Sequence, residues 1–163
     1  MIVSGYWDRV HLPLNPSLQE PSPVTKAVLS ALSTLASPQV RNVATVGGNI
    51  MWGSSGSDLR SIYLATGCKV KIWTVKDGEK MVDIAEVIEM RSGFIILELL
   101  LPLLNGHFEV SFFRKAKRKE FDLSIANACF VGKRSPGGFQ DLKIVFGGTG
   151  LAKGKQTHVR AQR

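Results

Sequence analysis

The chain has 163 residues, of which 44% are hydrophobic and 21% are charged, and this composition is typical of a globular protein with a real core. No stretch approaches the roughly 20 apolar residues of a membrane span, and we expect no secretory signal. The net charge of +8 favours anionic partners such as nucleotides, nucleic acid or acidic proteins. Cys68 and Cys129 fit no metal-ligand spacing, so two isolated thiols indicate a reducing, cytoplasmic compartment.

A proline-rich stretch, residues 1–23, opens the chain and predicts an extended lead-in. The first good helix follows, because Ser22 suits its N-cap and Pro23 suits its first position. Pro38 is expected to mark its end. The apolar residues that repeat at helical spacing are Val24, Ala27, Val28, Ala31, Leu32 and Leu35.

The next segments combine turn signals with a short helix. The run Val40–Ile50 predicts a glycine-rich turn, and Gly53–Ser57 predicts a loop. Asp58 suits the cap of a helix over Leu59–Thr66, and Gly67 suits its end.

Two strands and a turn follow that helix. Cys68–Val75 alternates as a strand does, and Asp77-Gly78 predicts a hairpin turn to a second strand through Val82. Ala85–Met90 predicts one helical turn, and Ile95–Leu101 predicts a central strand.

The pattern changes near Asn105. Three strand-like segments follow, His107–Ala116, Ile125–Val131 and Leu142–Phe146, the last two linked by Ser135–Gly138. They predict a small three-stranded antiparallel sheet and an α+β fold. We therefore expect a lead-in over residues 1–23, a partial cofactor-binding subdomain over 24–105 and a partial α/β domain over 106–163.

The segment Thr45-Val46-Gly47-Gly48-Asn49 has the chemistry of a nucleotide site. Two adjacent glycines allow positive φ and a close approach of the backbone to a ligand, and consecutive N–H groups form an anion-binding concavity. Asp58 suits a hydrogen bond from a sugar hydroxyl. Taken alone, the same residues are better explained as a tight turn and a helix cap. They lack the spacing of a dinucleotide fingerprint or a phosphate loop.

The surrounding sequence resembles a known family. Ala36–Ile50, with Ser57-Asp58-Leu59 behind it, resembles the signature of the flavin domain in molybdenum hydroxylases, the group of xanthine dehydrogenase and aldehyde oxidase. Phe113–Arg118 and Val145–Gly150 resemble two later motifs of that domain, in the same order. The resemblance covers most of the chain and does not separate the two kinds of parent enzyme.

This resemblance implies the second half of a vanillyl-alcohol-oxidase-type FAD-binding domain, followed by the small sheet domain. It implies FAD as cofactor, no metal site and no catalytic side chain in this chain. In the complete enzymes FAD relays electrons from iron–sulfur clusters to NAD or oxygen, and iron–sulfur and molybdenum-cofactor domains or subunits are the partners. The residues that match the family's cofactor contacts are Thr45, Val46, Gly47, Gly48, Asn49, Asp58, Ile96 and Arg114.

Several departures bear on activity. Complete family members begin with another glycine-rich segment that holds the FAD pyrophosphate, and nothing in Met1–Pro23 resembles it. Leu35 replaces a common Phe, and Trp52 replaces a small residue, where it either crowds the cofactor or stacks on it. Val159-Arg160-Ala161 resembles the start of the family's closing helix. We expect a chain truncated at both ends that binds FAD weakly and has little or no turnover.

Other features carry weaker alternatives. The basic run Arg114–Lys119, near three phenylalanines, resembles a nucleic-acid surface, but a solvated strand end or a cofactor-facing patch is the favoured interpretation. Three scattered histidines have no catalytic spacing. Two functions therefore stay open: an FAD-binding part of a molybdenum hydroxylase, or a non-catalytic remnant that acts, if at all, as an interaction module.

Overall fold

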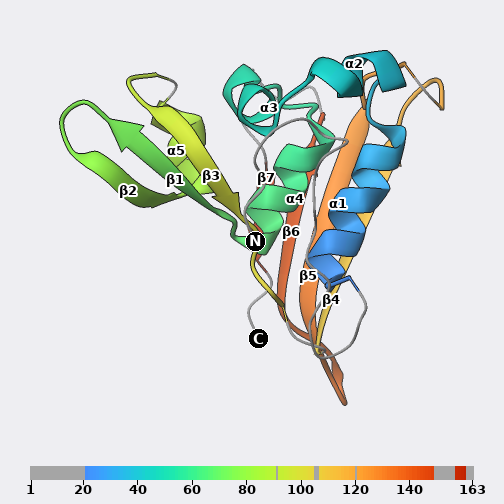
Figure 1. The fold of residues 1–163 in the computed structure, drawn as a ribbon. Helices are drawn as coiled ribbons and strands as arrows, with labels where there is room; N and C mark the ends of the chain where they lie inside the picture. Colours follow the sequence, from blue (N-terminus) through green and yellow to red (C-terminus); the bar gives the residue numbers. More distant parts are fainter. Residues whose placement is uncertain (1–20, 91, 105–106, 120, 149–156, 161–163) are drawn as a thin grey trace.

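A computed structural model describes residues 21–90, 92–104, 107–119, 121–148 and 157–160. The fold is α+β, with two antiparallel sheets and helices packed between and beside them (Figure 1). One sheet has three strands in the order β2-β1-β3, and the other has four in the order β4-β5-β6-β7. No helix in the described part of the chain is long and apolar enough to cross a membrane.

Helix α1 (Pro23–Thr34) begins as the sequence predicts. The hydroxyl of Ser22 accepts a hydrogen bond from the amide of Thr25 at 3.2 Å, and proline occupies the first position. The helix ends before Pro38, and Pro38 itself opens a further helix, α2 (Pro38–Val43), capped by Ser37. Proline marks a helix start here, because its fixed φ suits the first position of a helix.

Helices α3 (Val46–Trp52) and α4 (Asp58–Thr66) correct two further expectations. The segment predicted to be a glycine-rich turn is largely helical, since α2 and α3 together span most of it. The N-cap of α4 is Ser57, and Asp58 is its first residue. Gly67, with φ 71°, ends α4 in the left-handed conformation, as predicted.

The three-stranded sheet comprises β1 (Lys69–Thr74), β2 (Gly78–Asp83) and β3 (Ile95–Leu100), with α5 (Ile84–Met90) between β2 and β3. The predicted hairpin is confirmed, since Thr74 pairs with Gly78. The prediction of β3 as a central strand is wrong: β1 is central and β3 lies at the edge. An apolar run indicates that a strand is buried, but it does not indicate which strands lie beside it in the sheet.

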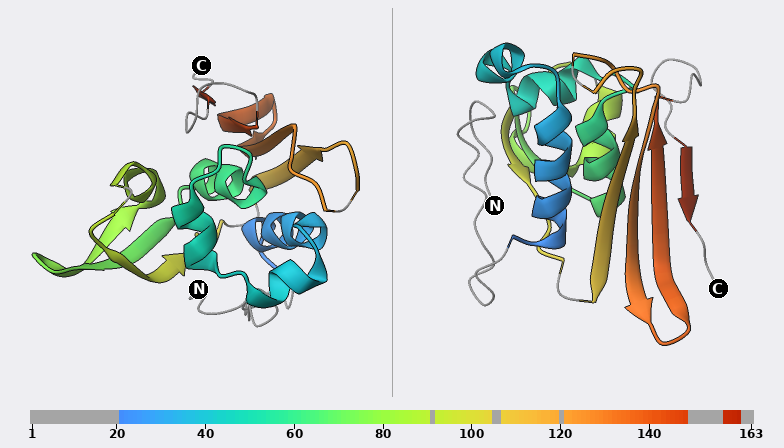
Figure 2. Two further views of the ribbon diagram at one scale, coloured as in Figure 1. Left: turned by 90° about the horizontal axis from the view of Figure 1, so that it is seen from above. Right: turned by 90° about the vertical axis from the view of Figure 1, so that its right-hand side faces the viewer.

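The four-stranded sheet comprises β4 (Phe108–Lys115), β5 (Ala126–Ser135), β6 (Gly138–Gly147) and β7 (Thr157–Arg160). The first three confirm the predicted antiparallel segments. The sheet has one strand more than predicted, because β7 pairs with β6. Of the residues expected to begin a closing helix, Val159 and Arg160 thus lie in β7 (Figure 2), and Ala161 lies outside the described residues.

Helix α4 occupies the centre of the fold. It lies between the two sheets and packs on β5 and β6, while α1 packs beside it on β4 (Figures 1 and 2). All nine residues of α4 are buried, and Leu59 and Ile62 are fully inaccessible. One continuous hydrophobic core joins residues on both sides of position 105, including Ile72 of β1 and Val145 of β6. The subdomain boundary near Asn105 stays a prediction, as does the lead-in, of which residues 1–20 lie outside the described part.

The two cysteines are part of this core. Cys68 and Cys129 are free and have no exposed surface. Burial raises the pKa of each thiol to about 12, so both are neutral thiols at physiological pH. Both cysteines thus pack as small buried residues.

Candidate functional site

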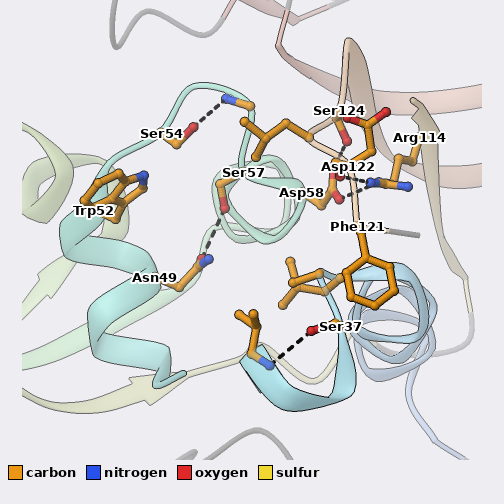
Figure 3. A pocket seen from close by; sticks show the side chains of 15 residues that line it. Ser37, Asn49, Trp52, Ser54, Ser57, Asp58, Arg114, Phe121, Asp122 and Ser124 are labelled. Carbon is orange, nitrogen blue, oxygen red and sulfur yellow. Dashed lines mark hydrogen bonds and ion pairs between the residues drawn. The ribbon is translucent and has the colours of Figure 1, made fainter. Parts of the chain in front are cut away.

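A cavity of about 380 Å³ opens between α2, α3, the start of α4 and the loop that joins β4 to β5 (Figure 3). Its walls come from four places in the chain: residues 35–40, residues 49–58, Arg114 and residues 121–124. The volume lies at the lower end of the range of about 300–1,000 Å³ that is common for ligand pockets. The cavity thus suits a small ligand or part of a larger one.

The floor of the cavity holds a buried carboxylate, Asp58, which is only 4% exposed. Its Oδ2 accepts a hydrogen bond from Nε of Arg114 at 2.9 Å, and its Oδ1 accepts from the hydroxyl of Ser124 and from Nδ2 of Asn127 at 3.2 Å. Figure 3 shows the Arg114 and Ser124 contacts. Protein donors therefore occupy both oxygens, and the side chain fastens α4 to β4 and β5.

Electrostatics set the cost of this arrangement. Burial raises the pKa of Asp58, and the hydrogen bond from Ser124 and the positive charge of Arg114 oppose the rise. The Asp58–Arg114 ion pair is itself buried, with side chains 5% and 10% exposed. The ionised form of Asp58 is therefore stable in this buried setting only while Arg114 and Ser124 remain in place.

Arg114 links three structural elements. Besides Asp58, it donates from Nη2 to the carbonyl of Asp122 and from Nη1 to that of Lys119 at 3.5 Å. The basic run predicted to be a solvated or cofactor-facing patch thus begins with a residue whose side chain is only 10% exposed. Arg118 donates from Nη2 to the carbonyl of Phe121 at 2.8 Å, so two of the run's cations hold the loop.

The same loop is tied from within by Asp122. Its Oδ2 accepts from the amides of Lys117 at 2.9 Å and Arg118 at 3.0 Å, and the bond from Arg118 lowers the pKa of this carboxyl. Phe121, beside it, has φ 56° and is 58% exposed. Sequence patterns did not indicate that residues 121–124 line a site, because the loop's course depends on long-range contacts.

The motif Thr45–Asn49 forms the start of α3. The hydroxyl of Thr45 accepts from the amide of Gly48 at 2.9 Å, which is an N-cap. Neither Gly47 nor Gly48 has positive φ, so the expected conformation is wrong. A Cβ at position 48 would lie 2.9 Å from the Thr45 hydroxyl oxygen, so a larger residue there would require the capping side chain to shift.

The eight matched residues fall into two neighbouring groups. Asn49, Asp58 and Arg114 line the cavity. Thr45 to Gly48 lie at the start of α3 outside that lining, and a Cβ on Gly47 would lie 4.0 Å from Cβ of Ile96 on β3. Helix α3 connects the groups, since Asn49 follows Gly48 directly.

Asn49 is the residue of the cavity best placed to meet a ligand. Its Oδ1 accepts from the hydroxyl of Ser57 at 3.1 Å, as Figure 3 shows. Among the described residues none accepts a hydrogen bond from its side-chain NH₂, and the residue is half-buried in the wall. The donors at the start of α3 and this amide fit the phosphate and hydroxyl groups of a nucleotide.

The comparisons with known proteins place these observations in a family. A family model described as the FAD binding domain in molybdopterin dehydrogenase matches residues 12–104, and the chain belongs to this family. It is 32% identical over 133 residues to xanthine dehydrogenase of Oryza sativa subsp. japonica, which covers 76% of this chain and 10% of that protein. It is 33% identical over 144 residues to aldehyde oxidase 4 of Cavia porcellus, covering 81% and 11%.

Solved structures agree in fold. Carbon monoxide dehydrogenase of Hydrogenophaga pseudoflava matches with a TM-score of 0.67 at 21% identity, over 86% of this chain and 50% of that one. Quinoline 2-oxidoreductase of Pseudomonas putida 86 matches with a TM-score of 0.66 at 20% identity, over 91% and 50%. The chain thus spans about a tenth of the curated relatives and about half of the solved chains. FAD is the cofactor of the family, as the sequence predicts.

Proposed function

We propose that this chain binds FAD in the cavity between α2, α3, α4 and the β4–β5 loop, as the FAD-binding portion of a larger molybdenum hydroxylase. One observation carries the proposal: three of the matched residues, Asn49, Asp58 and Arg114, lie together in the wall of one cavity. The family model spans the segment that builds most of that wall.

The residues have different tasks in this proposal. Asn49 donates from its amide to the cofactor, and the amides of Val46 and Gly47 at the start of α3 face its negatively charged groups. Asp58 does not bind the cofactor through a free oxygen; with Arg114 it holds the wall in shape. Ile96 of β3 lies next to Gly47, in the first turn of α3.

Bound FAD supplies electron-transfer chemistry, and the chain's part is to hold and orient it. In the whole enzyme we propose that this portion takes electrons from iron–sulfur clusters and passes them to NAD or oxygen. Its partners there are iron–sulfur and molybdenum-cofactor domains or subunits. We further propose that the three-stranded sheet with α3 and α4 is the later half of a vanillyl-alcohol-oxidase-type domain. The match to an FAD-binding domain over residues 12–104, which include these elements, supports this assignment.

Titration of the purified chain with FAD, followed by the change in flavin fluorescence, tests the proposal. We expect a dissociation constant on the order of 10 µM, because the cavity has room for only part of the cofactor. Asn49→Ala is expected to weaken binding about fivefold through the loss of one donor. Gln140→Ala, on the exposed part of β6, serves as the matched control and leaves binding unchanged.

Two results would contradict the proposal in different ways. No binding at about 1 mM FAD would exclude a working site in this chain. Sub-micromolar binding would show that the chain holds the cofactor without help from elsewhere in a parent enzyme, against the weak affinity expected.

The second candidate is a non-catalytic remnant that keeps the fold. The hydrogen bonding of Asp58 favours it, since a carboxylate with three protein donors serves stability without any ligand. This candidate predicts a colourless protein that does not respond to added FAD.

A further inference from the structure

Trp52 has an unusual position for a tryptophan. It is the last residue of α3, before Gly53 ends the helix with φ 62°, and it is 83% exposed. It also lines the cavity. Exposing a large aromatic surface is unfavourable unless something covers it, so the side chain stabilises little in this state and is available to a ligand.

The open volume of the cavity indicates whether Trp52 crowds the cofactor or stacks on it. A volume of about 380 Å³ stays open with the indole in the wall, so Trp52 does not fill the site. Phe121, 58% exposed, borders the cavity from the other side, and Figure 3 shows Asn49, Ser57 and Asp58 between the two rings. The site therefore has aromatic surfaces at two sides and a polar floor.

Several polar groups in the wall already have one partner within the protein. The hydroxyl of Ser37 accepts from the amide of Val40 at 3.2 Å, and that of Ser54 accepts from Gly56 at 3.3 Å. Ser57 donates to Asn49. Since these groups and Asp58 already have protein partners, contact with an exposed ring adds to the affinity that the remaining donors supply.

We propose that Trp52 is the ring-stacking residue of this cavity and holds a planar heteroaromatic ring of the bound nucleotide, with Phe121 on the opposite side. The inference rests on the proposed function, and FAD offers two such rings, the isoalloxazine and the adenine. Aromatic stacking tolerates either, because every such ring has a π-face.

Calorimetric titration of the full chain with FAD tests this inference. Trp52→Ala is expected to weaken binding about tenfold or more, and Trp52→Phe, which keeps a ring, less than about threefold. Trp73→Ala is the matched control, because Trp73 is 39% exposed on β1 and lies outside the cavity lining. That variant is expected to bind FAD as the wild type does.

The fragments riboflavin and AMP, used as competitors of FAD, identify the ring. The fragment that carries the stacked ring competes less well in Trp52→Ala than in the wild type. Since Trp52 is 83% exposed, its replacement is expected to leave the melting temperature unchanged, and this separates a binding effect from unfolding.

The outcomes of this experiment are distinct. Wild-type binding that Trp52→Ala leaves unchanged overturns the inference and leaves the proposed function standing. Equal competition by both fragments in the two proteins overturns it as well. Absence of binding in the wild type overturns the proposed function itself and the inference with it.

Discussion

Asp58→Ala is expected to destabilise the fold by about 3 kcal/mol, with a melting temperature roughly 6–12 °C lower for a chain of this size. The physical reason is that the variant leaves Arg114 buried without its carboxylate, and leaves Ser124 and Asn127 without an acceptor. Thermal unfolding followed by circular dichroism measures the shift.

Two controls make this result specific. Asp77→Ala removes the exposed pair with Lys80, whose side chains are 46% and 37% exposed, and is expected to cost less than about 1 kcal/mol. The double variant Asp58→Leu with Arg114→Met is expected to lose less free energy of unfolding than the two single variants lose together, because it leaves no charge buried. A loss in Asp58→Ala no larger than in Asp77→Ala would contradict the buried network.

Gly148→Ala is expected to cost roughly 2–4 kcal/mol, the second large effect. Gly148 has φ 74°, and a Cβ there would lie 2.8 Å from the carbonyl oxygen of Ile125 and 3.0 Å from that of Ser124. Left-handed backbone alone costs about 1–2 kcal/mol for a residue with a Cβ, and a clash with backbone adds to it. Chemical denaturation measures the free energy of unfolding.

Gly67→Ala is the matched control for that substitution. Gly67 has a similar φ of 71°, but no heavy atom lies within 4 Å of the position of its Cβ. It carries the conformational cost without the clash, so the difference between the two variants reports the close approach. The amide of Gly148 donates to the carbonyl of Ser55 at 2.8 Å. Gly148→Ala is therefore also expected to disturb the loop before α4, which lines the cavity. Equal losses in both variants would refute the close contact.

Local signals in the sequence predict much of the fold. The start of α1 at Ser22 and Pro23 and the end of α4 at Gly67 follow from capping preferences that involve only neighbouring residues. The hairpins after Asp77 and after Ser135 follow from turn chemistry in the same way. Each of these depends on a few consecutive residues.

Features that depend on contacts between distant residues could not be predicted from the sequence. Two adjacent glycines favour a turn on propensity, yet Gly47 and Gly48 begin α3, because the cap by Thr45 and the packing of Ile50 in the core outweigh that cost. The resemblance to the family named Asp58 and Arg114 as candidate site residues but did not indicate their pairing across 56 positions. The place of β3 at an edge depends on which strands neighbour it.

The central claim is that FAD binds in the cavity of Asn49 and Asp58. Nuclear magnetic resonance tests it most directly, through the backbone amide shifts of the ¹⁵N-labelled chain as FAD is added. The account predicts that the shifted amides cluster at residues 46–58 and 121–124, with the amides of the hairpin between β5 and β6 unmoved. Shifts confined to another surface, or none at saturating FAD, would contradict it.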